Sequence, residues 1–412
     1  MVRTTPSGAR AVARCLELGR APYSDMEGGL YRGYLTPAHR AAIDRMAQWM
    51  RAAGMTTRVD GAVNLIGRYD GSTDAPPLIL ASHIDSVRNA GVYDGPLGIM
   101  LGIECVARLA AEGRRMPFPI EVIAFGDEEG SRFPVSMLTS KTLAGSLTGI
   151  PEMADADGTR FADALAAFDT SPEQVLAAAH SGALAYLEAH IEQGPALQAE
   201  GLALGIVTGI AAQLRLQATV IGMAGHAGTS SMDLRRDALA GAAEMMVAIE
   251  RTARDDASDL VATVGCLEAF PGATNVIPGE VRFTIDLRSG DAGRRDRASA
   301  AILHEIAAIA ARRQLDLRVE TVQDFPASPC DAGLMALLDD AMAAAGHPAR
   351  HLVSGAGHDA MNMAPLCPAA MLFIRCRDGI SHNPAEHVEP DDAEAALAVM
   401  SGFIEKLGEL HA

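Results

Sequence analysis

The chain has 412 residues, of which 49% are hydrophobic and 21% are charged, and this composition excludes a largely disordered protein. Its 34 basic and 52 acidic residues give a formal net charge of −18, which disfavours nucleic acid and anionic membrane surfaces as partners. A chain of this length exceeds one ordinary hydrophobic core, so we expect two domains.

The cysteines and the N-terminal stretch bear on location. The six cysteines are scattered without a CxxC spacing, which favours reduced thiols and a cytoplasmic protein. The stretch from Met1 to Leu18 holds three arginines but no continuous apolar run, and no other segment approaches the length of a membrane span. We therefore expect neither a signal peptide nor a membrane anchor.

The first part of the chain alternates apolar runs with helical periodicity, as in α/β folds. The expected elements are a helix over 37–53 capped by Thr36, an extended segment over 56–63, a strand ending at His83, a helix over 97–111, a strand over 120–125 and a strand over 185–191.

The middle of the chain changes to the order βαββαβ, which is typical of a ferredoxin-like split unit. The expected strands are 214–223, 261–270, 280–287 and 316–322, and the expected helices are 236–254 and 294–313. We predict that residues 209–324 form a domain inserted into a discontinuous one made of 1–208 and 325–412. The last part should contain a helix over 331–345, a glycine-rich loop over 354–357, a strand over 370–376 and a helix over 390–407.

Two of the predicted strands end in clusters of potential metal ligands. The first ends in His83-Ile84-Asp85 and is followed, eleven residues after His83, by Asp94-Gly95. The second ends in Asp127-Glu128-Glu129-Gly130. Catalytic groups of open α/β sheets gather at the carboxyl ends of strands, and divalent metals prefer imidazole and carboxylate ligands. The pattern indicates a metal-dependent hydrolase.

The spacing of these residues suggests distinct roles. Because His83 and Asp85 lie two apart at a strand end, they share a face, and Asp85 is placed to orient the imidazole rather than to bind metal. Asp94 can bridge two metals through its two oxygens. Glu129 is the expected ligand, and Glu128 is the expected general base that takes the proton of an activated water.

His190 and His382 complete this hypothesis. A dinuclear site needs about two further protein ligands per metal. His83 and His190 could serve one metal, while Glu129 and His382 serve the other. Taken singly, each histidine fits a surface or core position better than a ligand position, and the combination is what favours a metal site.

The motifs resemble those of the amidohydrolase branch of the M20 metallopeptidase family, which contains N-carbamoyl-L-amino-acid hydrolases, allantoate amidohydrolases and β-ureidopropionases. They span nearly the whole chain in order. The matching stretches are Ser82-His83-Ile84-Asp85-Ser86, Tyr93-Asp94-Gly95, residues 126–133 (GDEEGSRF), residues 190–195 (HIEQGP), residues 225–229 (GHAGT), residues 272–278 (GATNVIP), residues 354–360 (SGAGHDA) and residues 379–386 (GISHNPAE).

The resemblance implies a mixed-sheet, di-metal aminopeptidase-like catalytic domain with an inserted α+β ferredoxin-like domain that serves as a lid and for dimerisation. It implies two divalent metal ions per subunit, and zinc, manganese, cobalt and nickel all tolerate such ligands. The implied ligands agree with those reached from the residues: His83, Asp94, Glu129, His190 and His382, with Glu128 as the base. It also implies a homodimer formed through the inserted domain.

The resemblance further implies substrate contacts. The histidine at position 226 would reach into the partner subunit's site and stabilise the oxyanion. Asn275 and Arg288 would contact a substrate carboxylate, Gln193 would hold the ureido or carboxylate end, and Gly357 would supply a backbone contact.

The expected reaction is cleavage of the ureido or carbamoyl C–N bond of a small anionic carboxylate, either allantoate or an N-carbamoyl-L-amino acid. Two alternatives remain open: an aminoacylase or dipeptidase of the same fold acting on N-acyl amino acids, and a non-catalytic binding protein that kept the fold. The stretches 89–92 (NAGV) and 229–232 (TSSM) depart from the commoner family pattern. They touch no predicted ligand but leave substrate identity open.

Overall fold

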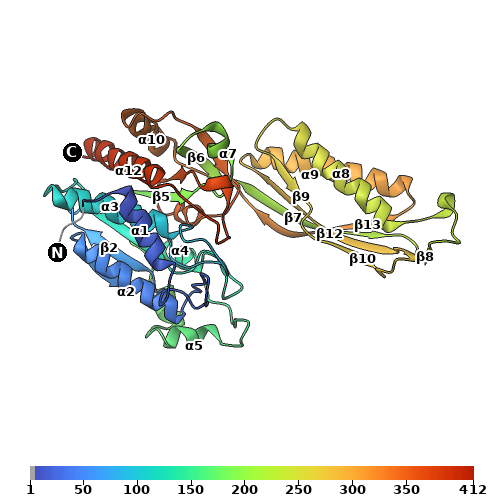
Figure 1. The fold of residues 1–412 in the computed structure, drawn as a ribbon, viewed down its shortest axis with the longest axis horizontal. Coiled ribbons are helices and arrows are strands. Elements are labelled where there is room, and N and C mark those ends of the chain that lie inside the picture. Colours follow the sequence, from blue (N-terminus) through green and yellow to red (C-terminus); the bar gives the residue numbers. More distant parts are fainter. Residues whose placement is uncertain (1–4) are drawn as a thin grey trace. The chain divides into compact units, whose positions relative to one another are not determined.

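The computed structural model describes residues 5–412, and the chain divides by its internal contacts into two compact units (Figure 1). Residues up to Thr208, Cys330–Leu352 and His358–Ala412 form the first unit, and Gly209–Pro329 and Val353–Gly357 form the second. The second unit therefore extends beyond residue 324 and includes a short segment that the sequence placed in the catalytic domain. Residues 1–4, the start of the stretch that lacks a signal-peptide pattern, lie outside the described range.

A mixed sheet with the strand order β1-β2-β4-β3-β5-β16-β6 runs through the first unit. The elements are α1 (Gly8–Leu18), α2 (Pro37–Ala52), β1 (Thr56–Val59), β2 (Leu65–Tyr69), β3 (Leu78–His83), α3 (Pro96–Ala111), β4 (Ile120–Phe125), α4 (Leu138–Leu143), α5 (Phe161–Ala166), α6 (Pro172–Leu176), β5 (Ala185–Ile191), α7 (Ala196–Glu200), β6 (Leu204–Ile210), α10 (Ala332–Ala344), β15 (His351–Ser354), α11 (Ala360–Met363), β16 (Ala369–Ile374) and α12 (Pro390–Leu410).

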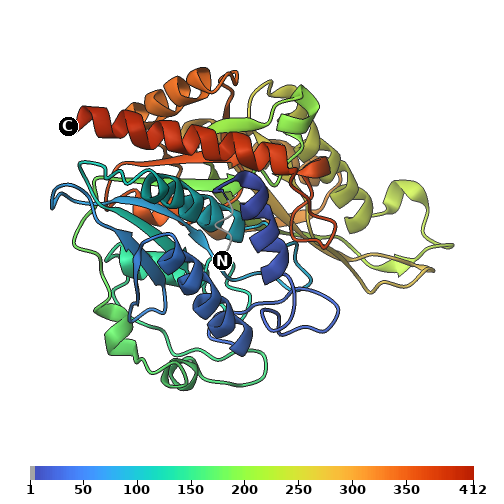
Figure 2. The same cartoon turned by 60° about the vertical axis from the view of Figure 1, so that its left-hand side comes forward.

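The central strands of this sheet are parallel, as their apolar character predicted. β3 pairs in parallel with β4 and β5, and β16 pairs in parallel with β5, whereas β2 and β6 are antiparallel to their neighbours. Every residue of β3, β4 and β5 is buried. Helices α1, α3 and α10 contact the long C-terminal helix α12, and α3 also packs on β3, β4 and β5 (Figure 2). Strands buried on both faces explain the continuous hydrophobic runs.

A glycine fixes the connection from β3 to α3. Gly95 has φ +83°, a left-handed conformation that favours glycine, and a Cβ at this position would lie 2.5 Å from both Cε1 and the carbonyl oxygen of His83. Pro96 then begins α3 at a position where its missing N–H costs no helical hydrogen bond. The first turn of α3 is thus held against the end of β3, and Asp94 is brought beside His83.

The second unit has the predicted βαββαβ order around an antiparallel sheet of strand order β10-β12-β7-β13. Its helices α8 and α9 pack on each other and on β7 and β12. The elements are β7 (Ala212–Ile221), β8 (Gly225–His226), α8 (Ala238–Asp255), β9 (Val261–Thr263), β10 (Leu267–Phe270), β11 (Val276–Ile277), β12 (Glu280–Ser289), α9 (Ala292–Arg312), β13 (Asp316–Phe325) and β14 (Ser328–Pro329).

Two expected extended segments differ from the structure. The strand predicted over 261–270 is divided into β9 and β10 because its pairing with β12 is irregular. Thr263 pairs with Asp286 and Leu267 with Phe283, so the three residues 264–266 lie opposite the two residues 284–285. The segment predicted over 56–63 ends as a strand at Val59. The next residue, Asp60, forms a turn because its side chain accepts hydrogen bonds from two backbone N–H groups.

Among residues 5–412, no helix combines the length and apolar character needed to cross a membrane.

Candidate metal centre

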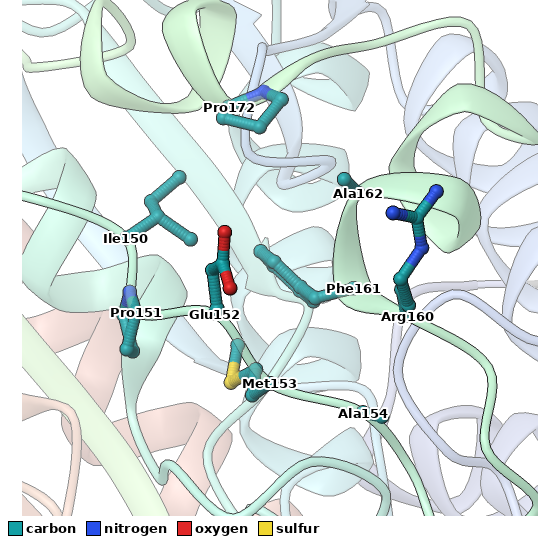
Figure 3. Close-up of a pocket in the computed structure, with 9 residues that line it drawn as sticks. All are labelled: Ile150, Pro151, Glu152, Met153, Ala154, Arg160, Phe161, Ala162 and Pro172. Atoms are coloured by element: carbon teal, nitrogen blue, oxygen red, sulfur yellow. The ribbon is translucent and has the colours of Figure 1, made fainter.

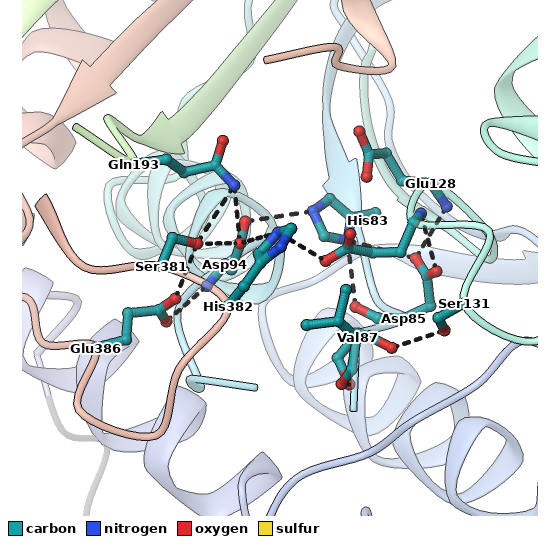
Figure 4. Close-up of polar contacts among 12 residues, drawn as sticks. His83, Asp85, Val87, Asp94, Glu128, Ser131, Gln193, Ser381, His382 and Glu386 are labelled. Atoms are coloured by element: carbon teal, nitrogen blue, oxygen red, sulfur yellow. Dashed lines mark hydrogen bonds and ion pairs between the residues drawn. The ribbon is translucent and has the colours of Figure 1, made fainter. Parts of the chain in front are cut away.

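The carboxyl ends of β3, β4 and β5, together with two loops, bring the five predicted ligands of the first unit close to one another. Figure 4 labels three of them, His83, Asp94 and His382. In the β3–β4 register His83 lies opposite Phe125, so the acidic pair that follows β4 begins beside it. Two ligands come from loops, one before α3 and one between β16 and α12. The five are His83, Asp94, Glu129, His190 and His382.

Asp94 lies at the middle of this group, and its two oxygens face different partners. Oδ1 is 3.1 Å from Nε2 of His190 and 3.7 Å from Nε2 of His83. Oδ2 is 3.3 Å from Nε2 of His382, and the same nitrogen is 3.4 Å from Oε1 of Glu129. One carboxylate thus lies between two sets of potential ligands.

The hydrogen bonds of two histidines fix which nitrogen faces Asp94. Nδ1 of His83 lies 3.3 Å from Oδ1 of Asp85 and 3.2 Å from the Asp85 carbonyl oxygen, and Nδ1 of His190 lies 2.9 Å from the carbonyl oxygen of Ile191. When Nδ1–H donates to these acceptors, Nε2 keeps its lone pair for a metal. Both imidazoles therefore present Nε2 to Asp94.

Asp85 has a second function that its spacing from His83 did not indicate. Its Oδ1 accepts a hydrogen bond of 3.0 Å from the backbone N–H of Glu128, and its Oδ2 accepts one of 3.1 Å from that of Glu129. Asp85 is fully buried. It ties the loop after β4 to the end of β3 and orients the acidic pair as well as the imidazole.

The carboxylates of this cluster favour added positive charge. Hydrogen bonding to Asp94 raises the pKa of His382 to about 9. Burial acts to lower the pKa of His83 and of His190, but their carboxylate partners outweigh it and raise both pKa values. Burial acts to raise the pKa of Asp94, but hydrogen bonds to the three histidines outweigh burial, and the pKa of Asp94 lies well below its usual value. Protons or metal cations can supply the charge that the cluster attracts.

The adjacent glutamates show the opposite shift. Burial, with Asp94 adding to it, raises the pKa of Glu129 to about 7. Burial also raises the pKa of Glu128 well above its usual value, and the neighbouring Glu129 adds to this shift. A cation beside the pair would lower both pKa values and keep both groups as carboxylates.

The donor set fits divalent cations. When Nδ1–H of His190 donates to Ile191, Nε2 carries no hydrogen, and the buried Oδ1 of Asp94 then has no hydrogen-bond donor among residues 5–412, a costly state that a cation would relieve. The ligand atoms of His83, Asp94 and His190 lie within 4.8 Å of one another, as do those of Asp94, Glu129 and His382. Nitrogen and oxygen donors of this kind suit zinc, manganese, cobalt and nickel. Two further groups share these residues: His83 with Glu128 and Glu129, and His190 with Glu188 and His358.

Three side chains near Asp94 hold it in place, and sequence reasoning assigned none of them to it. Ser381 donates from Oγ to Oδ2 of Asp94 at 2.6 Å, and Gln193 donates from Nε2 to the same oxygen at 2.9 Å. Glu386 accepts hydrogen bonds from the backbone N–H groups of Tyr93 and Asp94. Ser381 and Glu386 lie within four residues of His382, and that proximity was the available signal.

The backbone around this group is strained at two non-glycine residues. Gln193 has φ +56° and His382 has φ +54°, both in the left-handed region. Such conformations cost of order 1 kcal/mol each and cluster at functional sites.

The remaining predicted residues belong to the second unit and are described within it. His226 is exposed in β8, and its Nδ1 accepts a hydrogen bond of 3.0 Å from the backbone N–H of Gly228. Arg235 supports the same loop by donating to the carbonyl oxygens of Ser230 at 3.1 Å and Ala227 at 2.6 Å. The loop geometry is therefore fixed by a neighbouring guanidinium.

Arg288 is held at the end of β12. Its guanidinium donates to both oxygens of Asp286, at 2.7 and 3.0 Å, and to the carbonyl oxygen of Gly355 at 2.6 Å. Arg288 and Asp286 line a cavity of about 410 Å³ in the second unit. Asn275 is exposed, and its backbone carbonyl oxygen accepts a hydrogen bond from the backbone N–H of Ala227. Gly357 ends the short segment 353–357 of the same unit.

A separate cavity of about 490 Å³ lies in the first unit (Figure 3). Its lining residues come from the segment 150–172 and are mostly apolar. No predicted ligand or substrate contact lines it.

The mixed sheet with histidines and carboxylates gathered at its strand ends defines an α/β protein with candidate metal-binding clusters. The sequence matches the family described as Peptidase family M20/M25/M40 over residues 79–406, and the chain belongs to this family.

Several known proteins are similar to this chain over almost its full length. An N-carbamoyl-L-amino acid amidohydrolase of Geobacillus stearothermophilus is 39% identical, with 98% of this chain and 99% of the relative covered. Allantoate deiminase 1 of Glycine max is also 39% identical, with coverage of 96% and 89%. The crystal structure of a hydantoinase/carbamoylase family amidase from Burkholderia multivorans matches with a TM-score of 0.90 and 34% identity over 98% of each chain.

Proposed function

We propose that this protein is a metal-dependent amidohydrolase that cleaves the carbamoyl C–N bond of a small ureido carboxylate, either allantoate or an N-carbamoyl-L-amino acid. The position of Asp94 between two histidine-containing ligand sets is the observation that carries the proposal. The names of the two full-length relatives support the substrate class.

His83, His190 and one oxygen of Asp94 would hold one divalent ion, and His382, Glu129 and the other oxygen would hold a second. When bound, such ions act as Lewis acids that polarise the substrate carbonyl and lower the pKa of water. The buried Oδ1 of Asp94 supports this assignment, because among residues 5–412 it has no hydrogen-bond donor when the Nδ1–H of His190 is given to Ile191.

Glu128 is the proposed general base. Its carboxylate takes a proton from the attacking water and delivers it to the leaving nitrogen as the C–N bond breaks. Asp85 supports this role because it holds the Glu128 backbone N–H at 3.0 Å. The carbamate released by cleavage decomposes to carbon dioxide and ammonia.

The second unit would supply substrate contacts and act as a lid. Arg288 offers a planar guanidinium for the substrate carboxylate, with Asn275 and Gly357 as further contacts, and its orientation is fixed by Asp286. The imidazole of His226 would stabilise the oxyanion in the site of a second subunit.

The amide of Gln193 supports a carbamoyl rather than an acyl substrate. Its NH₂ group donates to Asp94, and this hydrogen bond fixes which end of the amide is oxygen. The remaining Oε1 is buried and has no hydrogen-bond partner within residues 5–412. The terminal NH₂ of a carbamoyl group can donate to this acceptor, whereas the methyl group of an acetyl substrate would leave it unpaired.

Replacement of Gln193 with leucine should lower the preference for N-carbamoyl over N-acetyl amino acids. One lost hydrogen bond to a buried acceptor corresponds to roughly 1–3 kcal/mol, or about 5- to 150-fold in the ratio of the two kcat/KM values. Gln198→Leu is the control, because Gln198 is exposed and exchanges two hydrogen bonds with Asp378, away from Asp94. An equal loss on both substrates would remove the specificity role and leave Gln193 as a support for Asp94.

A substrate panel assayed on metal-reconstituted protein tests the proposed function. It should contain allantoate, N-carbamoyl-L-amino acids, N-acetyl-L-amino acids, dipeptides and a carbamoyl substrate whose carboxylate is amidated. We expect turnover of ureido acids and a large loss on amidation. Faster cleavage of N-acetyl substrates or dipeptides would indicate an aminoacylase or dipeptidase, and binding without turnover would indicate a non-catalytic protein.

A homodimer with shared sites predicts complementation between two inactive variants. In a mixture of Glu128→Gln and His226→Ala chains, each mixed dimer has one site with both residues intact, so an equal mixture should recover about a quarter of wild-type activity. The variants should be mixed under conditions that exchange subunits, and the mass should be checked by light scattering. A monomeric mass, or no recovery in confirmed mixed dimers, would contradict this arrangement.

A cytoplasmic location is also proposed. All six cysteines are free thiols, and Cys15, Cys105, Cys367 and Cys376 are buried. Reduced thiols are typical of the cytoplasm. Fractionation of the producing cells would test the location, and recovery in an extracytoplasmic fraction would contradict it.

A further inference from the structure

Glu386 takes no part in the proposed chemistry, yet its carboxylate is buried beside Asp94 (Figure 4). Its Oε1 accepts hydrogen bonds from the backbone N–H of Tyr93 at 2.7 Å and from that of Asp94 at 3.1 Å. These two donors belong to the turn that carries Asp94 into α3. A carboxylate that accepts two backbone N–H groups fixes the position of the turn.

The space for this carboxylate exists because residue 91 is glycine. A Cβ on Gly91 would lie 2.3 Å from both Cβ and Cδ of Glu386 and 2.4 Å from its Oε1. No carbon atom can occupy that position while Glu386 stays in place. The stretch before Asp94 therefore closes over the Glu386 side chain, and the two residues are matched in size.

Ser381 links the same loop to the side chain of Asp94. Its Oγ lies 2.6 Å from Oδ2 of Asp94 and 3.4 Å from Oε2 of Glu386. The hydroxyl has one hydrogen, which the shorter contact to Asp94 takes. The loop before α12 thus holds Asp94 by its backbone through Glu386 and by its carboxylate through Ser381.

We propose that Glu386 is a positioning residue that fixes the Asp94 turn, so that the two carboxylate oxygens face the two ligand sets. The proposal rests on the metal centre proposed above. Without Glu386, two backbone N–H groups lose their acceptor and Asp94 must be ordered when the metal binds, which weakens binding. Partners that orient a metal ligand typically contribute about 10- to 100-fold in metal affinity.

The test is a titration of metal-free protein with Co²⁺, followed by visible absorption, together with the Tm of each metal-free variant. We expect Glu386→Ala to bind Co²⁺ about 10- to 100-fold more weakly than wild type. Glu386→Gln keeps one acceptor oxygen and should recover part of the affinity. Gly91→Ala should weaken binding in the same way, because the added methyl group displaces the carboxylate.

The control is Glu389→Ala in the same loop, since Glu389 is 51% exposed and pairs with Arg377 and His387. It should bind Co²⁺ like wild type. Wild-type affinity in both Glu386→Ala and Gly91→Ala would overturn the proposal, as would a lower Tm without a change in Co²⁺ affinity. If wild type binds no Co²⁺, the metal centre itself fails, whereas two bound ions in wild type and unchanged binding in Glu386→Ala reject only the role of Glu386.

Discussion

Replacement of Glu128 with glutamine should reduce kcat by about 10²- to 10⁴-fold, the range for loss of a positioned general base, while both metal ions stay bound. Glutamine keeps the size of the side chain but cannot take a proton from water. The backbone N–H at this position would still donate to Asp85, so the loop after β4 should keep its geometry. The measurement is kcat on the best ureido substrate together with the metal content of the same sample.

Glu112→Gln is a suitable control, because Glu112 is exposed at the end of α3 and has no role in the proposed site. It should retain wild-type kcat. Wild-type turnover in Glu128→Gln would remove the proposed base. Loss of metal together with turnover would instead make Glu128 a ligand, as its presence in a group with His83 and Glu129 allows.

Replacement of Asp94 with alanine should lower metal content as well as kcat. Both ligand sets share this carboxylate, so we expect metal content to fall from two ions to one or none per chain. Loss of the metal contribution to catalysis is worth several kcal/mol, and we expect kcat to fall by at least about 10³-fold. Metal analysis after dialysis against a weak chelator, combined with kcat, measures both effects.

Asp44→Asn, an exposed position on α2, controls for the loss of one acidic side chain. Retention of two ions by Asp94→Ala would show that Asp94 does not bridge. A fall to one ion with near-wild-type turnover would show that one metal is sufficient, and the dinuclear account would then be wrong.

The parts of the fold predicted from the sequence are those with strong periodicity and clear ends. β3 and β4 were predictable because they are largely apolar runs that stop at His83 and at Gly126, and parallel pairing then brings their ends together. The short strand β6 was missed, since Leu204–Ile210 contains two glycines and lacks a clear alternation. Helix α1 was also missed, although its buried residues recur at helical spacing.

The candidate site was predictable at the level of residue type and less so at the level of contacts. His83, Asp94 and Glu129 follow strand ends, where such chemistry is expected. The contact of Glu386 with the Asp94 backbone joins positions 292 residues apart, and no local pattern reports it. Gln193 was expected to face substrate, but its NH₂ group donates to Asp94, and its buried Oε1 has no hydrogen-bond partner in the described part of the chain.

The roles proposed for His226, Asn275 and Arg288 rest on family resemblance, because a dimer contact leaves no periodic signal in one chain. What the structure adds is how they are held: Arg288 by Asp286, and the His226 loop by Arg235.

Anomalous diffraction from crystals of the manganese- or zinc-loaded protein tests most directly whether side chains from distant parts of the sequence hold two cations. We expect two peaks per chain on either side of the Asp94 carboxylate, one beside His83 and His190 and the other beside Glu129 and His382. A single peak, or peaks away from Asp94, at saturating metal in an active preparation would contradict it.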